Sequence, residues 1–253
     1  MREHLLLLLE APLQAWGGVL VDAYGPVDEF PAATLVGGLV ANALGYDRAD
    51  WQRLEALQER LVVGAAVLRR GSTITDNQNA KLEKGDVGWT TRGRPEGRGG
   101  GAEAYKSPHR RFRDYHADTL ALVALRLDPE DEKPDLDAIA HTLEWPERPL
   151  FLGRKPCLPS RSIVWPERMR AETLLKALNL GAAMLVAAES ANPKLRLELD
   201  AGPWRARWPE REGNAPSSRL VEVCDDRDFR NDVPVGLRRR RVGTIGEERE
   251  HTP

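Results

Sequence analysis

The chain contains very little cysteine. Only Cys157 and Cys224 occur among its 253 residues, and neither lies in a CxxC motif or at metal-ligand spacing from a histidine. Disulfide scaffolds need several paired cysteines, and structural zinc sites need four closely spaced ligands. We therefore expect neither a disulfide framework nor a metal site, and no other cofactor is indicated.

Long apolar runs are lacking as well. The strongest run is the five leucines of residues 5–9, which Pro12 soon follows. A membrane-spanning helix needs about 20 apolar residues, and a signal peptide needs a longer apolar core with a cleavage site. We therefore expect a soluble, cytoplasmic protein with no membrane partner, in which residues 5–9 form a buried strand.

The apolar periodicity predicts an α+β fold. Strands are expected at residues 5–9, 61–68, 119–127 and 150–152, and helices at residues 34–44 and 134–143, with a further amphipathic stretch at 50–61. Thr34 is the expected N-cap of the first helix. Strand, helix, strand, strand, helix, strand is the order of the ferredoxin-like (RRM/RAMP) plan.

The length of the chain suggests one large domain or a domain with an appendage. We predict a ferredoxin-like domain over residues 1–165 and a smaller β-rich part over residues 166–253, with a helix at 172–188 and strands at 195–199 and 220–223. Residues 69–116 separate two strands that should form a hairpin. Hairpin loops normally have two to five residues, so this excursion is either disordered or functional.

No charge of one sign is in excess over the whole chain, since 37 basic residues face 39 acidic ones. The two signs are nevertheless segregated. Residues 1–60 carry 4 basic and 9 acidic residues. Residues 88–113 carry 7 basic and 2 acidic residues, and residues 148–170 carry 6 basic residues and 1 acidic residue. A neutral chain can therefore still present basic patches to nucleic acid.

The basic excursion has the composition of an RNA-binding segment. Arginine pairs bidentately with phosphate, and aromatic rings stack on unpaired bases. The candidate contacts are Arg92, Arg94, Lys106, Arg110, Arg111 and Arg113, interleaved with Trp89, Tyr105, Phe112 and Tyr115. The alternative is a solvated, disordered loop.

Two more basic segments are weaker candidates. Arg154 and Lys155 follow Gly153 at the end of an expected strand and could hold phosphates, or they could belong to an ordinary turn. The run of four arginines at residues 238–241 is expected on an edge strand, where alternation would place half of the charges on each face.

Three short motifs occur in order along the first 165 residues. They are APLQAWG at residues 11–17, FRDYHAD at 112–118 and LGRKPC at 152–157. In this order they resemble the CasD family, a subunit of the type I-E CRISPR Cascade complex within the RAMP superfamily. The matching positions are Gln14, Trp16, Gly17, Phe30, Pro31, Arg113, Tyr115, Asp118, Gly153, Arg154, Lys155 and Cys157.

The resemblance implies a non-catalytic RNA-binding subunit. A thumb, here at about residues 70–116, would press on the 5′ handle of the crRNA and cap it. The implied partners are CasC-type backbone subunits and the large subunit CasA, with target DNA reached through the complex. The family usually carries a cationic step at the start of the first helix, where this chain has Ala32, Ala33 and Thr34. Thr34 and the helix N-terminus could still bind a phosphate through backbone N–H groups.

Other interpretations stay open. Related RAMP proteins are endoribonucleases that process CRISPR precursor RNA, and Tyr105, Lys106 and His109 could supply acid–base chemistry here. An RRM-type binder would need aromatics in its central strands, and residues 119–127 have none. Trp16 and Cys157 also suit packing roles.

Overall fold

The computed structural model describes residues 1–18, 21–80 and 109–246. Along the chain the strands are β1 Arg2–Glu10, β2 Leu13–Gln14, β3 Tyr24–Gly25, β4 Leu61–Arg69, β5 Ser72–Ala80, β6 His109–Ala117, β7 Leu120–Leu127, β8 Met169–Ala171, β9 Trp204–Pro209, β10 Arg219–Val223, β11 Asp226–Asp228, β12 Val233–Val235 and β13 Arg238–Ile245. The helices are α1 Ala33–Ala43, α2 Trp51–Arg60, α3 Leu136–Glu144 and α4 Leu174–Ala191, with a short 3-10 helix at Pro193–Leu195.

The main sheet of the described residues has seven strands in the order β10-β13-β9-β4-β7-β1-β8. Every neighbouring pair in it is antiparallel. The mixed α+β class with mostly antiparallel pairing is therefore confirmed. Residues 166–253 contribute β8, β9, β10 and β13 to this sheet, so the two parts predicted on either side of residue 165 share one hydrogen-bonded sheet, and their division into domains stays a prediction.

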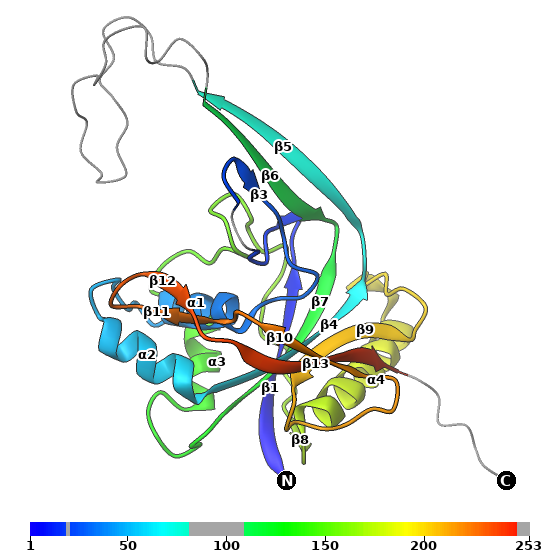
Figure 1. The fold of residues 1–253 in the computed structure, drawn as a ribbon. Coiled ribbons are helices and arrows are strands. Elements are labelled where there is room, and N and C mark those ends of the chain that lie inside the picture. Colours follow the sequence, from blue (N-terminus) through cyan, green and yellow to red (C-terminus); the bar gives the residue numbers. More distant parts are fainter. Residues whose placement is uncertain (19–20, 81–108, 247–253) are drawn as a thin grey trace, which may run out of the picture.

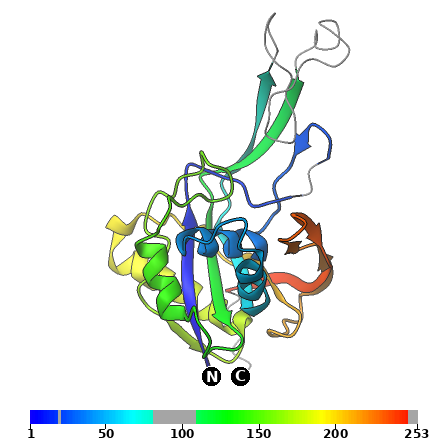
Figure 2. The ribbon, with the colours of Figure 1, turned by 90° about the vertical axis from the view of Figure 1, so that its left-hand side faces the viewer.

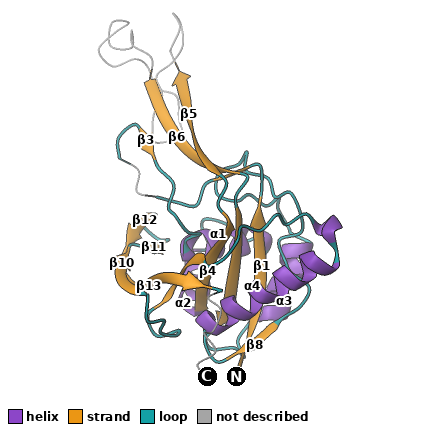
Figure 3. Cartoon of the chain, turned by 90° about the vertical axis from the view of Figure 1, so that its right-hand side faces the viewer, coloured by secondary structure: helices purple, strands orange, loops and turns teal. Residues whose placement is uncertain are grey.

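The leucine run explains why both faces of the sheet are covered. Side chains of a strand alternate between its faces. Leu5, Leu7 and Leu9 pack in a core with residues of α1, α2 and α3. Figure 2 shows these three helices on one side of the sheet. Leu6 and Leu8 pack in a second core with α4, which crosses the other face in Figure 3. A continuous apolar strand is what a sheet buried on both faces requires.

Helix α4 corrects the expectation that no segment reaches membrane-spanning size. It has 18 residues and is apolar enough by length and composition alone to cross a membrane. Its buried side packs against the sheet through residues that include Leu174, Leu178 and Leu185. Such packing is typical of a core helix.

Two predicted strands are wrong. Residues 150–152 form no strand, because the backbone N–H of Leu152 donates to the carbonyl of Cys157 at 2.8 Å and its carbonyl accepts from Ala15 at 3.0 Å. The strand next to β1 is instead β8, nearly twenty residues later. Residues 195–199 are also not a strand, since the 3-10 helix ends at Leu195 and Arg196 and Glu198 have positive φ.

The arginine run of β13 does not lie on an edge strand, contrary to prediction. Strand β13 pairs with β10 on one side and with β9 on the other. Arg240 is 3% exposed, binds Asp225 at 2.9 Å and donates to the carbonyl of Val63 at 3.2 Å. Arg238 pairs with Asp226. This run stabilises the fold and contributes little free cationic surface.

Candidate nucleic-acid interface

The long excursion begins and ends as a β-hairpin arm. Strands β5 and β6 pair antiparallel in continuous register, from Ser72 opposite Ala117 to Ala80 opposite His109. Figure 1 shows the arm rising beyond the main sheet, and every residue of β5 is exposed. The arm continues β4 and leads into β7, so its base is anchored in the centre of the sheet.

Salt bridges fix the base of the arm. Arg69, the last residue of β4, pairs with Glu10 and donates to the carbonyl of Asp118 at 2.8 Å. Arg161 pairs with the other oxygen of Glu10. Glu10 is 8% exposed, so both pairs are shielded from solvent. Shielded, charge-assisted bonds of this kind hold geometry better than exposed ones.

The two faces of β6 have different surroundings. Arg111, Arg113 and Tyr115 alternate onto one side, which we call the loop face because Arg113 there donates to the carbonyl of Ala23 and lines a groove together with Arg154. Arg110, Phe112, Asp114 and His116 alternate onto the other side, which we call the cavity face because Asp114 and His116 there line a cavity. Arg110 and Arg111 are exposed, and Arg113 is half-buried.

Arg154 ties the loop face together. Its guanidinium donates to the carbonyl of Asp114 on β6 at 2.7 Å and to the carbonyl of Gly25 on β3 at 3.0 Å. It also lies 4.6 Å from the centre of the Tyr115 ring. Arg113 makes a similar hydrogen bond, donating to the carbonyl of Ala23 at 3.2 Å. Both arginines thus join β6 to β3 while keeping their positive charge at the surface of the groove beside them.

That groove has a volume of about 610 Å³. It is lined by Gly17 and Gly18 after β2, by Thr34 and Leu35 of α1, and by Gly153, Arg113, Arg154 and Arg227. A narrower cavity of about 320 Å³ adjoins it around Thr34, Gly38 and Gly153. The structure therefore brings together the first-strand motif, the arm motif and the Gly-Arg-Lys motif, whose proximity the sequence did not indicate.

The start of α1 is capped differently from the prediction. Ala32, not Thr34, is the N-cap residue, and no side chain of the helix caps it. The backbone N–H of Thr34 donates to the Asp225 carboxylate at 3.3 Å. The Asp225 carboxylate occupies this N–H in the structure, and phosphate binding at the start of α1 stays a prediction. The capping partner lies 191 residues away, which local pattern could not reveal.

Gly153 allows the close approach of two of the motifs. Its φ is +102°, and a Cβ there would lie 1.9 Å from the carbonyl oxygen of Ala15. Leu152 accepts from the Ala15 N–H at 3.0 Å, and the loop closes on itself through Cys157 N–H and the Arg154 carbonyl at 2.9 Å. The Cys157 side chain is fully buried, and burial raises the pKa of its thiol, which favours packing over reactivity.

Gln14 and Trp16 form a buried hydrogen-bond chain. The amide of Gln14 donates to the carbonyls of Thr119 at 2.6 Å and Leu9 at 3.2 Å, and its oxygen accepts from the Trp16 indole at 2.9 Å. The Trp16 ring lies 4.3 Å from the ring of His116. Both side chains are 0% exposed, so the geometry supports a positioning role for them.

His116 is held as a neutral donor. Its Nε2 lies 2.8 Å from the carbonyl of Asp28, which can only accept, so this nitrogen carries the proton. Burial lowers the pKa of His116, and the Asp28 carbonyl offsets this only in part. The neutral ring therefore predominates near pH 7.

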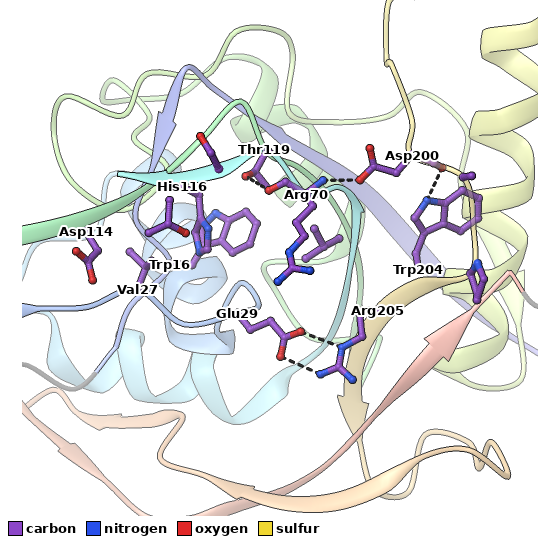
Figure 4. Close-up of a pocket in the computed structure, with 16 residues that line it drawn as sticks. Trp16, Val27, Glu29, Arg70, Asp114, His116, Thr119, Asp200, Trp204 and Arg205 are labelled. Carbon is purple, nitrogen blue, oxygen red and sulfur yellow. Dashed lines mark hydrogen bonds and ion pairs between the residues drawn. The ribbon is translucent and has the colours of Figure 1, made fainter. Parts of the chain in front are cut away.

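The cavity face opens on a second, larger cavity of about 860 Å³ at the base of the arm. Figure 4 shows Trp16 and His116 on one side of it and Trp204 on the other. Arg205 pairs with Glu29 through two bonds of 2.9 and 3.0 Å, and the Arg70 side chain points toward that pair. Sequence patterns did not indicate this cavity, because its walls come from four separate parts of the chain, which contribute Trp16 and Glu29, Arg70, His116 and Trp204 among others.

The predicted RNA-binding residues fall into four groups. Arg92, Arg94 and Lys106 lie outside the described residues, as do Tyr105 and the side chain of His109. Exposed cations are Arg110, Arg111 and Lys155; half-buried cations are Arg113 and Arg154; buried residues are Gln14, Trp16, Tyr115 and Cys157. Contact of any of them with RNA stays a prediction. Within the described ranges, no three His, Cys, Asp or Glu side chains are grouped as a metal site.

Solved structures share this fold. A chain of a CRISPR RNA-guided surveillance complex superposes with a TM-score of 0.60 over 96% of this chain and 89% of that chain, at 19% identity. A crystal structure of a Cas protein superposes with a TM-score of 0.54 over 95% of this chain and 93% of that chain, at 23% identity. The mixed α+β fold is thus of the kind found in these two CRISPR-associated structures.

The family follows from the sequence. The model of the CRISPR-associated protein family Cas_Cas5d (Cas_Cas5) matches residues 4–245, and the chain belongs to this Cas5 family. The CRISPR system Cascade subunit CasD of Escherichia coli (strain K12) is 39% identical over 59 residues. That match spans 23% of this chain and about a quarter (26%) of the curated relative. The predicted resemblance to CasD is confirmed.

Proposed function

We propose that this chain is the Cascade subunit that binds and caps the 5′ handle of the crRNA. The observation that carries the proposal is the groove on the loop face, where Arg113 and Arg154 come together from β6 and from the Gly-Arg-Lys motif. The exposed cations Arg111 and Lys155 stand nearby in sequence. Clustered guanidinium groups beside glycine-lined backbone suit a phosphate chain.

The arm is proposed to be the thumb that presses on the handle. Its paired strands are long and anchored in the sheet, and of these two described strands β6 carries the arginines and β5 carries none. The four strands β8, β1, β7 and β4 are neighbours in that order, which supports the ferredoxin-like plan for the core. In this proposal the neighbouring subunits are the CasC backbone and the large subunit CasA, and the complex acts in the cytoplasm on target DNA.

The salt dependence of RNA binding tests the proposal. The full chain would be mixed with fluorescent single-stranded RNA carrying the CRISPR repeat of the same genome, and Kd measured over a range of salt concentrations. The logarithm of the association constant falls as the logarithm of the salt concentration rises, and each lost phosphate contact reduces the magnitude of this negative slope by roughly 0.7. Arg111→Gln and Lys155→Gln should each lower it by about that amount. Arg219→Gln, on the edge strand β10, is the matched control and should leave the slope unchanged.

Assembly provides the second readout. Reversing Arg113 and Arg154 to Glu should reduce the crRNA that co-purifies with the partner subunits, because both cations line the groove. If RNA-bound complex assembles normally with both reversed, the groove is not the handle site. Equal salt slopes in wild type, Arg111→Gln and Lys155→Gln would also refute the phosphate assignment.

The proposal includes the absence of catalysis. The acid–base candidates Tyr105 and Lys106 lie outside the described residues. The absence of catalysis is therefore tested by an RNA cleavage assay and not by geometry. The purified chain would be incubated with repeat RNA in the presence of EDTA. Uncut RNA supports a binding subunit. Site-specific cleavage that disappears in His109→Ala would favour the endoribonuclease instead.

A further inference from the structure

An exposed aromatic pair lies on the cavity face of the arm, opposite the groove. Tyr24 on β3 stands beside Phe112 on β6, and their rings stack with centroids 4.8 Å apart and planes 13° apart. Tyr24 is 59% exposed, whereas Phe112 is half-buried between β3 and β5. One large ring of the pair therefore presents much of its surface to solvent.

The Tyr24 ring is rigidly mounted. The backbone around it closes a tight turn, with mutual bonds between Val21 and Tyr24 of 3.0 and 2.9 Å. Its neighbours Ala23 and Gly25 accept hydrogen bonds from Arg113 and Arg154. A solvent-exposed tyrosine on a loop would normally be mobile. Here hydrogen bonds hold the backbone on both sides of Tyr24, and the ring itself rests on Phe112, which reduces the conformational entropy lost when a ligand stacks on it.

Positive charge lies next to the ring. Arg110 is exposed on the same face of β6, two positions from Phe112, which is about 7 Å along a strand. Its guanidinium has no partner among the described residues. An exposed aromatic ring with an exposed cation at this distance has the composition of a single-strand stacking platform, on which a base lies on the ring while a nearby cation meets its phosphate.

We propose that Tyr24, backed by Phe112, is a stacking platform for one unpaired nucleobase. This inference rests on the proposed function and adds to it a second contact surface, on the opposite face of the arm from Arg113 and Arg154. The ligand chemistry is a single-stranded base with its adjoining phosphate. It could come from the guide RNA or from a DNA strand of the target, and the test separates these sources.

The test removes the Tyr24 ring from the protein and the bases from the probe, separately and together, and compares the Kd values. Probes are fluorescent oligoadenylates of about eight nucleotides, made as RNA, as DNA, and as a sugar-phosphate chain without bases. Their Kd is measured for the full-length wild type, Tyr24→Ala and Tyr24→Phe. Loss of one stacked base weakens binding roughly 5- to 150-fold. Tyr24→Ala should therefore weaken binding of the base-containing probe by that factor and leave binding of the base-free chain unchanged.

Two variants control the comparison. Tyr24→Phe keeps the ring and should bind like wild type. Trp145→Ala removes another exposed aromatic side chain, 71% exposed at the end of α3, and should change nothing. Tighter binding of the RNA probe identifies the guide as the source, and tighter binding of the DNA probe identifies a target strand.

The outcomes separate this inference from the proposed function. If wild type and Tyr24→Ala bind the base-containing probes equally, the platform is refuted while RNA binding stands. If Tyr24→Ala weakens binding of the base-free chain as much as binding of RNA, the ring does not read a base, and the platform is again refuted. If wild type binds none of the probes, the proposed function itself fails.

Discussion

Replacing Gly153 by alanine should destabilise the protein by separating its first-strand and Gly-Arg-Lys motifs. An alanine Cβ would lie 1.9 Å from the carbonyl oxygen of Ala15 and 2.8 Å from its carbonyl carbon. Both neighbours are backbone atoms, so no side chain can swing away. The φ of +102° adds a conformational cost that is about 1–2 kcal/mol for an L-residue in left-handed backbone.

Relief of the clash requires the two segments to move apart. That movement breaks the hydrogen bond between the Ala15 N–H and the Leu152 carbonyl, with a net contribution of about 1 kcal/mol. Together these effects predict a loss of about 2–3 kcal/mol in the free energy of unfolding. Because Arg154 follows directly, binding of repeat RNA should weaken as well.

Gly38→Ala is the matched control. Gly38 lies in α1, lines the same groove, and has open space around its Cβ position. Alanine in a helix interior is favoured over glycine by about 1 kcal/mol, so this variant should be more stable than wild type. Urea denaturation followed by circular dichroism measures both changes. A Gly153→Ala protein with a wild-type or higher midpoint would refute the reasoning about the contact.

Two further predictions concern buried polar groups. Asp225→Ala should cost about 3–5 kcal/mol in urea denaturation, because it leaves Arg240 charged and buried, whereas Glu210→Ala removes an exposed pair and should cost less than about 1 kcal/mol; equal losses would contradict this. The pKa values of His116 and His4 are lowered by burial, so the unfolded chain takes up protons more readily. The stability that their neutral forms contribute is complete above about pH 6.5 and is lost as the pH falls below it. Thermal denaturation should show that His116→Gln flattens this decline, and an unchanged pH profile would count against it.

Local pattern predicted the central elements well. The five-leucine run, the valine-rich strand before the arm and the apolar strand after it became β1, β4 and β7, because continuous apolar stretches need cover on both faces. The neighbour of β1 was missed because β8 has only three residues and no apolar run. Strand β9 was obscured by arginines, and β13 was predicted as an edge strand because the burial of Arg240 through its ion pair with Asp225 could not be foreseen.

The candidate site was predicted in its residues but not in its contacts. The motifs indicated Arg113 and Arg154, and the structure brings both to one groove. Both guanidinium groups donate to backbone carbonyls in or next to β3. This strand has only two residues, so no periodicity in the sequence could reveal it. Tyr24 was missed for the same reason, since its importance comes only from its place beside Phe112.

The pairing of β4 with β9 has a consequence for how the chain folds. Residues 61–69 remain without their partner on one side until residues 204–209 have been synthesised. Contacts so distant in sequence slow folding, and an unpaired strand edge invites association with other chains. We therefore expect nascent or truncated chains lacking β9 to depend on chaperones, with the edge of β4 as the place where they aggregate.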